Sequence, residues 1–262
     1  MPPMRPQVVA HRGASHERAE HTLGAYVEAI ELGADGLECD VRLTADGHLV
    51  CFHDRDTRRT GNHRGVVSTM ELAELDQLDF ASWKNPWADL DDEAPDRDVS
   101  LDRVLTLRRL LATVADCGRR VELAIETKHP TRYAGLVERR LVEELRHFGW
   151  DRGDSPVRVM SFSSTALQRV ERLAPDLRLV MLIEKARHWP MVKPVLADGW
   201  ILGPGIDQLT RHPTFGPKLV RTGRDIHVWT VNTDAQLQTC LDLGVKAVIT
   251  DRPGYLLQRL ED

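Results

Sequence analysis

Short apolar runs alternate with longer amphipathic stretches along most of the chain. The apolar runs predict nine strands, at residues 8–10, 36–43, 48–53, 121–127, 157–162, 177–183, 200–203, 226–231 and 246–250. Helical patterns follow most of these runs, and the clearest predict helices at residues 22–32, 100–117, 131–148 and 233–243. Strands that alternate regularly with helices are typical of a parallel sheet.

The ends of the predicted helices carry residues that favour helix boundaries. A glycine, which readily adopts the left-handed conformation that ends a helix, follows each of the four: Gly33, Gly118, Gly149 and Gly244. Thr233 and Gln236 form a Thr-x-x-Gln capping box at the start of the last helix. About eight strand–helix units in this length of chain favour a closed (βα)8 TIM-type barrel over an open doubly wound sheet. The sequence has no GxGxxG turn that would support a dinucleotide-binding fold.

One connection is too short to join two parallel neighbours. Only the Thr-Ala-Asp-Gly segment at residues 44–47 separates the strands predicted at 36–43 and 48–53. A parallel crossover needs about a dozen residues or more. These two strands are therefore expected to form an antiparallel hairpin, with Asp46-Gly47 as its turn.

The register of this hairpin decides which side chains share a face of the sheet. With the turn centred on the Ala-Asp dipeptide, Glu38 falls opposite His53, and Asp40 falls opposite Cys51. Directly opposed residues share a face, so these four side chains are expected together. Cys39 is expected to point the other way, toward the helices, where it could not easily form a disulfide with Cys51.

Residues 55–100 form the least regular stretch of the chain. They contain a short predicted helix at 68–75 and then a polar, proline-containing segment. We interpret this stretch as a lid or insertion over the barrel mouth after the third strand, so that residues 1–262 form a single (βα)8 barrel domain. Trp83 and Trp87 are expected mainly to pack the excursion onto the barrel, with a place in the substrate pocket as the alternative.

Composition and charge narrow the function classes. The chain has 262 residues, with 35 basic and 40 acidic side chains and a net charge of −5. Without a basic excess, nucleic-acid binding is not expected. No apolar run has the ~18 residues of a membrane-spanning helix, and the N-terminus lacks the apolar region of a secretory signal. The 4 cysteines show no metal-ligand spacing, so free thiols and a cytoplasmic location are predicted.

Polar residues stand at the ends of several predicted strands. They form four clusters: His11-Arg12-Gly13, Glu38 with Asp40, His53-Asp54, and Glu126-Thr127-Lys128. In a (βα)8 barrel, polar residues at the carboxyl ends of strands converge on the active site. Taken alone, each cluster is better explained by a chance motif, a solvated edge or a salt bridge. Together, in otherwise apolar strands, they point to a site, because buried charges are costly unless they are paired or bind a metal.

The residue types in these clusters suit a phosphoester reaction. Three facing carboxylates, Glu38, Asp40 and Glu126, would repel one another unless they bind a divalent cation. An all-oxygen ligand set suits Mg²⁺, Ca²⁺ or Mn²⁺ better than Zn²⁺. The two histidines are suited to proton transfer near neutral pH. Arg12 offers a planar fork for phosphate oxygens, and Lys128 adds a point charge.

An ordered set of short motifs extends over nearly the whole chain. The motifs are HRG (11–13), EHT (20–22), GADGLECDV (33–41), TADG (44–47), HD (53–54), RT (59–60), ETK (126–128), SF (161–162), WTVN (229–232) and TDRP (250–253). Together they resemble the glycerophosphodiester phosphodiesterase family. That resemblance implies a (βα)8 barrel that uses a divalent cation to hydrolyse glycerophosphodiesters to an alcohol and glycerol 3-phosphate.

The resemblance also implies roles for individual residues. The matching positions are His11 and His53 for catalysis, Glu38, Asp40 and Glu126 for the metal, Arg12 and Lys128 for the phosphate, and Trp229 for the substrate. Glu20 matches a residue that supports the site or adds a metal contact. His21 stands where the family has asparagine, and its role is open. Asn232 and Thr250 are expected only to cap helices.

The sequence leaves alternatives open for both the catalytic mechanism and the substrate. General acid/base catalysis by the two histidines is expected, with His11 preferred as base and His53 as acid. The nucleophile is either the glycerol 2-hydroxyl, which would give a cyclic phosphate, or water. A lysophospholipase D-like or sphingomyelinase D-like activity is the main alternative, because apolar residues of the excursion (Phe80, Trp83, Trp87 and Leu90) leave room for an acyl chain. A non-catalytic binding protein is disfavoured, since every catalytic histidine and metal carboxylate is present.

Overall fold

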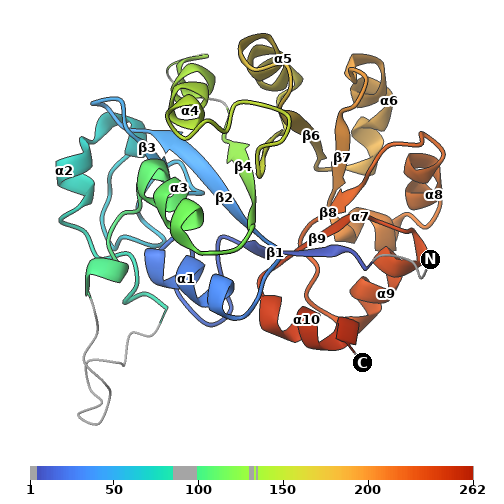
Figure 1. Ribbon diagram of the computed structural model, residues 1–262, viewed down its shortest axis with the longest axis horizontal. Helices are drawn as coiled ribbons and strands as arrows, with labels where there is room; N and C mark the ends of the chain where they lie inside the picture. The colour runs from blue at the N-terminus through green and yellow to red at the C-terminus, as the bar shows by residue number, and fades with distance from the viewer. Residues whose placement is uncertain (1–4, 85–98, 130–132, 134, 262) are drawn as a thin grey trace.

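The computed structural model describes residues 5–84, 99–129, 133 and 135–261. Within them, eight parallel strands form a nearly closed barrel with helices around its outside (Figure 1), as the sequence predicted. The strands are β1 (Gln7–His11), β2 (Gly36–Leu43), β3 (Leu49–Cys51), β4 (Glu122–Thr127), β5 (Val157–Ser161), β6 (Arg178–Ile183), β7 (Ile201–Pro204), β8 (His227–Val228) and β9 (Ala247–Thr250). Among these strands, only β3 runs antiparallel to its neighbour, which is β2.

The helices follow the parallel strands in order. They are α1 (Leu23–Glu31), α2 (Leu72–Leu75), α3 (Leu107–Asp116), α4 (Leu136–His147), α5 (Ser164–Leu173), α6 (Trp189–Val192), α7 (Ile206–Arg211), α8 (Phe215–Val220), α9 (Asp234–Asp242) and α10 (Pro253–Glu261). Short 3-10 turns are η1 (Val67–Thr69), η3 (Val99–Leu101), η4 (Ala186–His188) and η5 (Lys193–Val195). No helix in the described part of the chain is long and apolar enough to cross a membrane.

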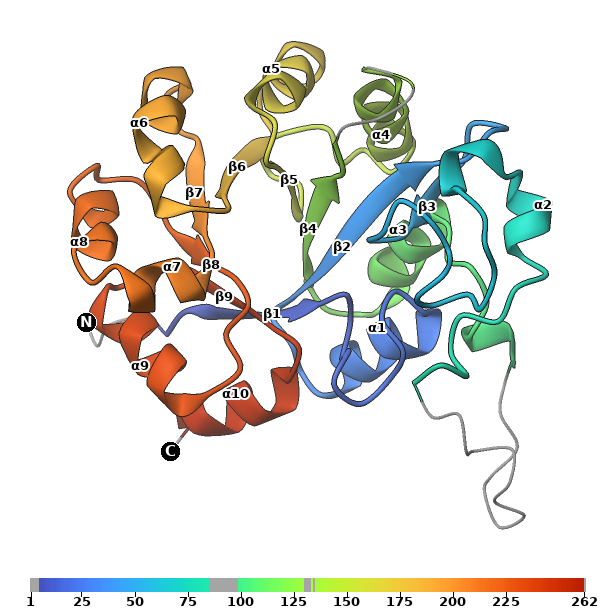
Figure 2. The same ribbon diagram turned by 180° about the vertical axis from the view of Figure 1, so that it is seen from behind.

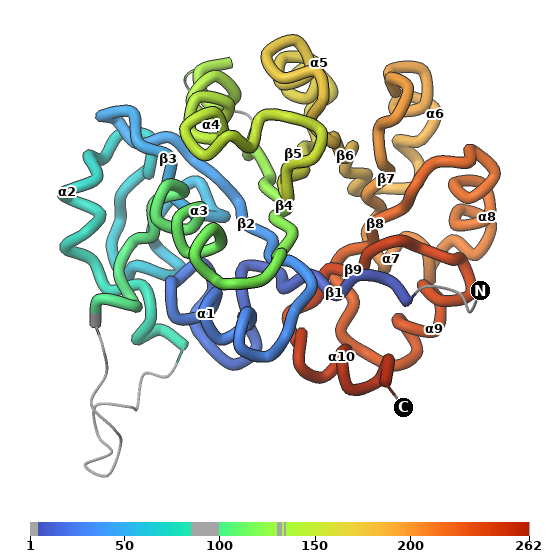
Figure 3. The backbone as a smooth tube through the Cα atoms, in the orientation of Figure 1, coloured from blue at the N-terminus to red at the C-terminus, as the bar shows by residue number. Residues whose placement is uncertain are grey.

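The sheet closes on itself through a weak seam. The strand order is β7-β6-β5-β4-β2-β1-β9-β8, and single bridges join β7 to the β8 region at Leu202–Ile226 and Gly205–Trp229. The first and last strands in sequence, β1 and β9, lie side by side, and α10 packs beside β1 (Figure 3). The two ends of the chain therefore contribute to one side of the barrel.

The alternation of side chains along β1 separates the barrel interior from the helix layer. Val8 and Ala10 pack in clusters with helix residues, whereas Val9 packs in a cluster drawn from β1, β4, β5, β6, β7 and β9. Successive side chains of a strand point to opposite faces. His11 therefore follows Val9 on the interior side, at the carboxyl end of β1.

Several predicted helix boundaries are confirmed, and others are wrong. Thr233 and Gln236 form the predicted capping box of α9. The helix predicted at 100–117 begins only at Leu107, because the Thr106 hydroxyl caps it by accepting a hydrogen bond from Arg109 N. The helix predicted at 68–75 is divided into η1 and α2, since a second capping box at Glu71 starts a new helix. The described part of the helix predicted at 131–148 starts at Leu136.

The predicted β2–β3 hairpin is confirmed, but its predicted register is wrong by one residue. Val41 pairs with Cys51, and Leu43 pairs with Leu49. The loop between the last paired residues thus holds five residues, 44–48, instead of four. Thr44 N donates to His48 O across this loop, and Gly47 turns the chain at a φ of 86°.

The shifted register overturns one predicted neighbour of the carboxylates. Cys51 does not share their face: it is buried in the core with Cys39, which points toward the helices as predicted. All 4 cysteines are free thiols, as expected. His53 lies beyond the end of β3, where the Arg42 guanidinium holds its carbonyl oxygen with hydrogen bonds of 3.0 and 2.7 Å.

The described part of the excursion packs onto the hairpin through a small apolar cluster. Val50 and Phe52 of the hairpin segment contact Val67, Leu75 and Phe80, and the excursion lies beside β3 on the outer side (Figure 2). The Trp83 indole donates to the Phe80 carbonyl at 2.8 Å, which agrees with a packing role for this tryptophan. Trp87 and Leu90 lie outside the described residues.

Candidate active site

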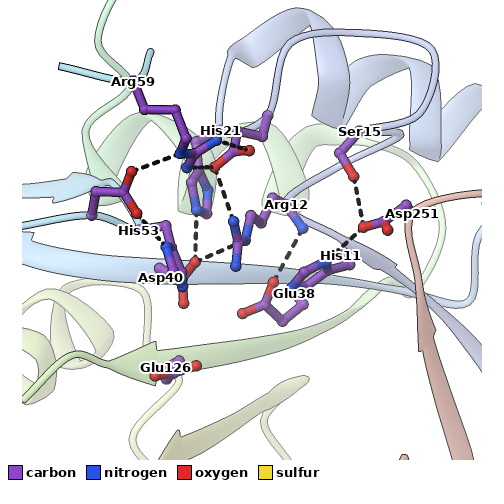
Figure 4. A network of polar contacts seen from close by, with 12 residues as sticks. His11, Arg12, Ser15, His21, Glu38, Asp40, His53, Arg59, Glu126 and Asp251 are labelled. Carbon is purple, nitrogen blue, oxygen red and sulfur yellow. Dashed lines mark hydrogen bonds and ion pairs between the residues drawn. The ribbon is translucent and has the colours of Figure 1, made fainter. Parts of the chain in front are cut away.

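Three buried carboxylates meet at the carboxyl ends of two neighbouring strands. Asp40 of β2 is the register partner of Glu126 of β4, and Glu38 of β2 is the register partner of His11 of β1. One oxygen from each of Glu38, Asp40 and Glu126 lies within 4.8 Å of the others, and each side chain is buried. Parallel pairing of inward-facing positions therefore creates the acidic cluster seen in Figure 4.

These carboxylates are in unequal electrostatic environments. Burial, and then the charge of Asp40, raises the pKa of Glu126 to about 8 and the pKa of Glu38 well above its usual value. Burial would also raise the pKa of Asp40, but Lys128, a hydrogen bond from His21 and the charge of Arg12 outweigh it and hold that pKa well below its usual value. Without a bound cation, burial and the charge of Asp40 therefore oppose the ionisation of Glu38 and Glu126, whereas Asp40 is held ionised.

The donor set fits a divalent cation. Three carboxylate groups supply oxygen ligands, which Mg²⁺ and Ca²⁺ prefer, and burial together with the charge of Asp40 raises the pKa values of Glu38 and Glu126. A bound divalent ion would relieve the repulsion and keep all three groups ionised.

Two protein cations border the cluster. The Lys128 Nζ atom lies 2.8 Å from Asp40 Oδ1 and 2.8 Å from Glu126 Oε1. The Arg12 Nε atom lies 3.1 Å from Asp40 Oδ2, and the Arg12 backbone N donates to Glu38 Oε2 at 3.1 Å. An anion placed between these side chains would meet positive charge from both sides.

The His-Arg-Gly turn places Arg12 by an unusual backbone conformation. Arg12 has a φ of 60° and Gly13 a φ of 85°, both in the left-handed region. A Cβ atom on Gly13 would lie 2.6 Å from the backbone carbon of Ala25. The turn therefore needs glycine, because the chain passes directly against α1.

His11 is held by an acid from the other end of the chain. Its Nδ1 atom lies 2.6 Å from Asp251 Oδ1, and that carboxylate also accepts hydrogen bonds from Ser15 Oγ at 3.1 Å and Asn232 Nδ2 at 2.7 Å. Burial would raise the pKa of Asp251, but its hydrogen bond with His11 leads the opposing effects, which lower that pKa to about 2. Asp251 therefore stays ionised and fixes the orientation of the imidazole.

His53 has a matching acid next to it in sequence. Its Nδ1 atom lies 2.7 Å from Asp54 Oδ1, and Arg59 Nε donates to Asp54 Oδ2 at 2.7 Å. Burial, opposed by the charge of Asp40, lowers the pKa of His53 to about 4. The imidazole is therefore neutral near pH 7 and has Nε2 available as a proton acceptor.

Glu20 connects the two arginines of the site. Arg59 donates to it at 2.7 and 2.6 Å, and Arg12 Nη1 donates to it at 3.0 Å. Burial would raise the pKa of Glu20, but these arginines outweigh it and lower the pKa to about 2. A continuous chain of hydrogen bonds and ion pairs thus runs from His53 through Asp54, Arg59 and Glu20 to Arg12 (Figure 4).

His21, whose role the sequence left open, is buried behind Asp40. Its Nε2 atom lies 2.9 Å from Asp40 Oδ2, and its Nδ1 atom lies 2.8 Å from the Tyr26 hydroxyl. Burial, opposed by the hydrogen bond to Asp40, lowers the pKa of His21. Because an ionised carboxylate only accepts hydrogen bonds, the Nε2–H group of His21 donates to Asp40 and orients it.

A cavity of about 260 Å³ gathers most of the predicted residues: His11, Arg12, Glu38, His53, Glu126, Lys128 and Trp229 all line it. Asp40 lies directly behind this wall, and Glu20 lies behind Arg12. The Trp229 ring meets Phe162 edge to face at 5.6 Å, and its Nε1 donates to Gly203 O at 2.8 Å. The tryptophan therefore forms a fixed apolar wall opposite the charged residues.

Sequence reasoning missed three polar residues of the site: Asp251, Asn232 and Arg59. Asn232 does more than cap a helix, because it donates to Asp251 and accepts hydrogen bonds from Thr250 Oγ1 and Asp251 N, each at 3.0 Å. The available signal was position, since Asp251 directly follows β9, the strand that pairs with β1.

Comparisons with known proteins agree with the geometry. The profile of the glycerophosphoryl diester phosphodiesterase family matches residues 11–255. The probable glycerophosphodiester phosphodiesterase 1 of Mycobacterium tuberculosis is 41% identical over 261 residues, covering 98% of this chain and 93% of that protein. The glycerophosphodiester phosphodiesterase of Bacillus subtilis is 33% identical over 256 residues, covering 96% and 85%.

Solved structures share the fold. A phosphodiesterase of Oleispira antarctica, in complex with the product sn-glycerol-3-phosphate, has a TM-score of 0.83 at 24% identity and covers 98% of both chains. A glycerophosphodiester phosphodiesterase of Agrobacterium tumefaciens has a TM-score of 0.71 at 26% identity, covering 95% of this chain and 97% of that one.

Proposed function

Since the chain belongs to the glycerophosphoryl diester phosphodiesterase family, we propose that it hydrolyses glycerophosphodiesters to an alcohol and glycerol 3-phosphate, with a divalent cation and two histidines in one cavity. The strongest support is one observation: three buried carboxylates lie at the same cavity as two imidazoles. The Nδ1 atom of each imidazole is hydrogen-bonded to an aspartate. The solved Oleispira antarctica phosphodiesterase holds sn-glycerol-3-phosphate as its product, and we carry this product class over as part of the proposal.

In this proposal Glu38, Asp40 and Glu126 hold the cation, which is Mg²⁺, Ca²⁺ or Mn²⁺. When bound, such an ion supplies Lewis-acid stabilisation of charge on a phosphate oxygen. Arg12 and Lys128 bind the remaining phosphate oxygens from either side of the cluster. Trp229 packs against the glycerol portion of the substrate.

The two histidines divide the proton transfers. His53 is neutral near pH 7, because burial lowers its pKa to about 4, so it accepts the proton of the nucleophile through Nε2. His11 donates a proton to the departing alcohol, and the ionised Asp251 at Nδ1 stabilises its imidazolium form. This assignment reverses the order preferred from the sequence.

The nucleophile is the glycerol 2-hydroxyl in the first of two routes. Its oxygen attacks phosphorus, its proton passes to His53, and the bond from phosphorus to the alcohol oxygen breaks as His11 protonates that oxygen. Water then opens the cyclic phosphate with the proton roles exchanged. The second route is direct attack by water. A substrate that lacks the 2-hydroxyl separates them, since undiminished turnover contradicts the cyclic route.

An assay for released glycerol 3-phosphate tests the proposal. Wild type should release it from glycerophosphocholine, while chelator, His11→Ala or His53→Ala should each reduce the rate by about 10²–10⁴-fold. His212→Ala removes an exposed imidazole remote from the cavity and should act as wild type. Full activity in the chelated sample and in both site variants contradicts the proposal. Faster turnover of lysophosphatidylcholine than of glycerophosphocholine favours a lysophospholipase D-like activity.

A further inference from the structure

A second cavity adjoins the candidate active site. Its volume is about 590 Å³, and its polar wall includes Arg42, Arg55, Lys128 and His129. Lys128 also lines the catalytic cavity, so the two spaces meet at this residue. Its lining residues include Leu43 at the end of β2, Ser68 and Thr69 of η1, and Val137 near the start of α4.

The two cavities differ in size and in lining. Pockets for small ligands usually span roughly 300–1,000 Å³. The catalytic cavity, at about 260 Å³, is smaller than this range, whereas the second cavity, at about 590 Å³, falls within it. A phosphodiester carries two ester groups on one phosphorus. If the glycerol group lies against Trp229, the second cavity, on the other side of Lys128, is available to the departing alcohol.

The polar wall of the second cavity is lined by basic residues. No carboxylate of the described residues lines it, and its polar wall also offers the hydroxyl groups of Ser68 and Thr69. Two of the basic wall residues are paired with buried acids: the Lys128 Nζ atom lies 2.8 Å from both Asp40 and Glu126, and the His129 Nε2 atom lies 3.1 Å from Glu138. The unbalanced positive charge of the wall therefore rests on Arg42 and Arg55, which form no ion pair with any described residue.

Both arginines of this wall have N–H groups that are not used in hydrogen bonds with described residues. Arg42 uses Nε and Nη2 on the His53 carbonyl, and its Nη1 makes no hydrogen bond within the part of the chain that the structure describes. Arg55 is exposed, and its guanidinium makes no hydrogen bond or ion pair with any described residue. Guanidinium groups bind phosphate and carboxylate through two parallel hydrogen bonds. The wall is thus complementary to an anion.

The same wall is unsuited to a cationic alcohol. Quaternary ammonium groups are recognised by aromatic cages or by carboxylates. Of the described residues that line the cavity, Tyr133 is the only aromatic one apart from His129, and its hydroxyl donates to Ser68 O at 2.8 Å. A choline or ethanolamine group would lie against two arginines, and like charges brought together disfavour binding.

We propose that this second cavity binds the leaving alcohol and selects alcohols that carry a phosphate or carboxylate group. Arg42 and Arg55 bind that anionic group, and Lys128 connects it to the scissile phosphate. This inference rests on the proposed function, because it assigns the second arm of a diester whose hydrolysis occurs in the first cavity.

Matched substrates and matched variants test the inference. Glycerophosphoinositol and glycerophosphoinositol 4-phosphate differ only in one phosphate on the alcohol, and glycerophosphocholine supplies a cationic alcohol. Arg55→Glu reverses the charge in the cavity, while Arg64→Glu makes the same change on an exposed residue that does not line it. We expect wild type to have the highest kcat/KM for the phosphorylated substrate. Arg55→Glu should lower the ratio of the value for the phosphorylated substrate to the value for glycerophosphoinositol by about tenfold or more.

The charge control and a binding measurement complete the test. Arg64→Glu should leave the preference unchanged. Calorimetry should detect inositol 4-phosphate binding to wild type and about tenfold weaker binding to Arg55→Glu. Equal losses in the two variants, or a preference of wild type for glycerophosphocholine, overturn the inference while leaving the proposed function intact. Failure to hydrolyse any of the three substrates with any of the three cations overturns both.

Discussion

The Nδ1 atom of His11 lies 2.6 Å from Oδ1 of Asp251, a residue 240 positions later in the chain. His11 ends β1 and Asp251 follows β9, and these strands pair in parallel register. Barrel closure thus brings an acid to the imidazole of the first strand. The second histidine, His53, takes its acid from the next residue, Asp54. Both imidazoles thus contact an aspartate through Nδ1, but one aspartate is distant in sequence and the other is adjacent.

Replacing Asp251 with asparagine should reduce kcat by about 10²-fold or more while KM changes little, because the imidazolium of His11 loses its ionised partner. The variant should retain the circular dichroism spectrum of wild type. Ser15→Ala, which removes only a 3.1 Å hydrogen bond to the same carboxylate, is the control and should cost less than about tenfold. An Asp251→Asn enzyme with the kcat of wild type would show that the 2.6 Å contact has no part in the reaction.

Replacing Glu126 with glutamine should abolish cation binding yet stabilise the protein in chelator at high pH. The folded-state pKa of Glu126, about 8, is above its usual value, so the stability penalty appears as pH rises from about 4.5 and is complete above about 8. In chelator at pH 9 the variant should therefore melt at a higher temperature than wild type, and at pH 4.5 the difference should be small. Added cation should raise the melting temperature of wild type only. Equal melting curves at pH 9 would contradict the repulsion inferred for the cluster.

The imidazole of His53 should titrate well below the usual histidine range. Burial lowers its pKa to about 4, so an NMR titration of chelated protein should show its ring signals changing near pH 4. The signals are assigned by their loss in His53→Ala. Since the unfolded chain binds this proton near pH 6.5, the buried neutral form contributes stability that is lost as pH falls from about 6.5 toward 4. A midpoint near 6.5 would remove the reason for assigning the base to His53.

Replacing Gly13 with alanine should disrupt the His-Arg-Gly turn. A Cβ atom there would lie 2.6 Å from the Ala25 backbone, at a φ of 85°, so backbone must move. The loss of unfolding free energy should exceed the roughly 1–2 kcal/mol of a left-handed alanine alone. Gly33→Ala is the matched control, because its φ is 86° but nothing lies within 4 Å of the new atom. Equal losses in denaturant titrations of the two variants would show that the contact with α1 is unimportant.

Features that depend on residues close in sequence were predictable. The alternation of apolar positions located all nine strands of the described residues, and Thr233 with Gln236 marked the start of α9. Glu126 and Lys128 are two residues apart, so alternation along an extended strand places them on one face, and their side chains meet at 2.8 Å. These features rest on backbone periodicity and on local hydrogen bonds, which a short stretch of chain specifies by itself.

The failures arose where one residue or one distant contact changed the outcome. A five-residue loop in place of four moved Cys51 from the predicted carboxylate face into the core. The start of α3 depended on which hydroxyl, that of Thr106, reached a free backbone N–H group. Arg59 was given no role from the sequence beyond its place in the RT motif, yet it bonds to both Asp54 and Glu20.

Read by itself, the chain determined the kind of fold, the acidic pair on β2, the two histidines and the basic residues near them, because spacing along a strand or helix sets the direction of each side chain. Only the tertiary structure shows that Asp251 contacts His11 and accepts a hydrogen bond from Asn232. It also shows that Glu20 pairs with two arginines and that a basic cavity adjoins Lys128. Those relationships join residues far apart in sequence, and a local pattern carries no information about which distant elements closure of the sheet will bring into contact.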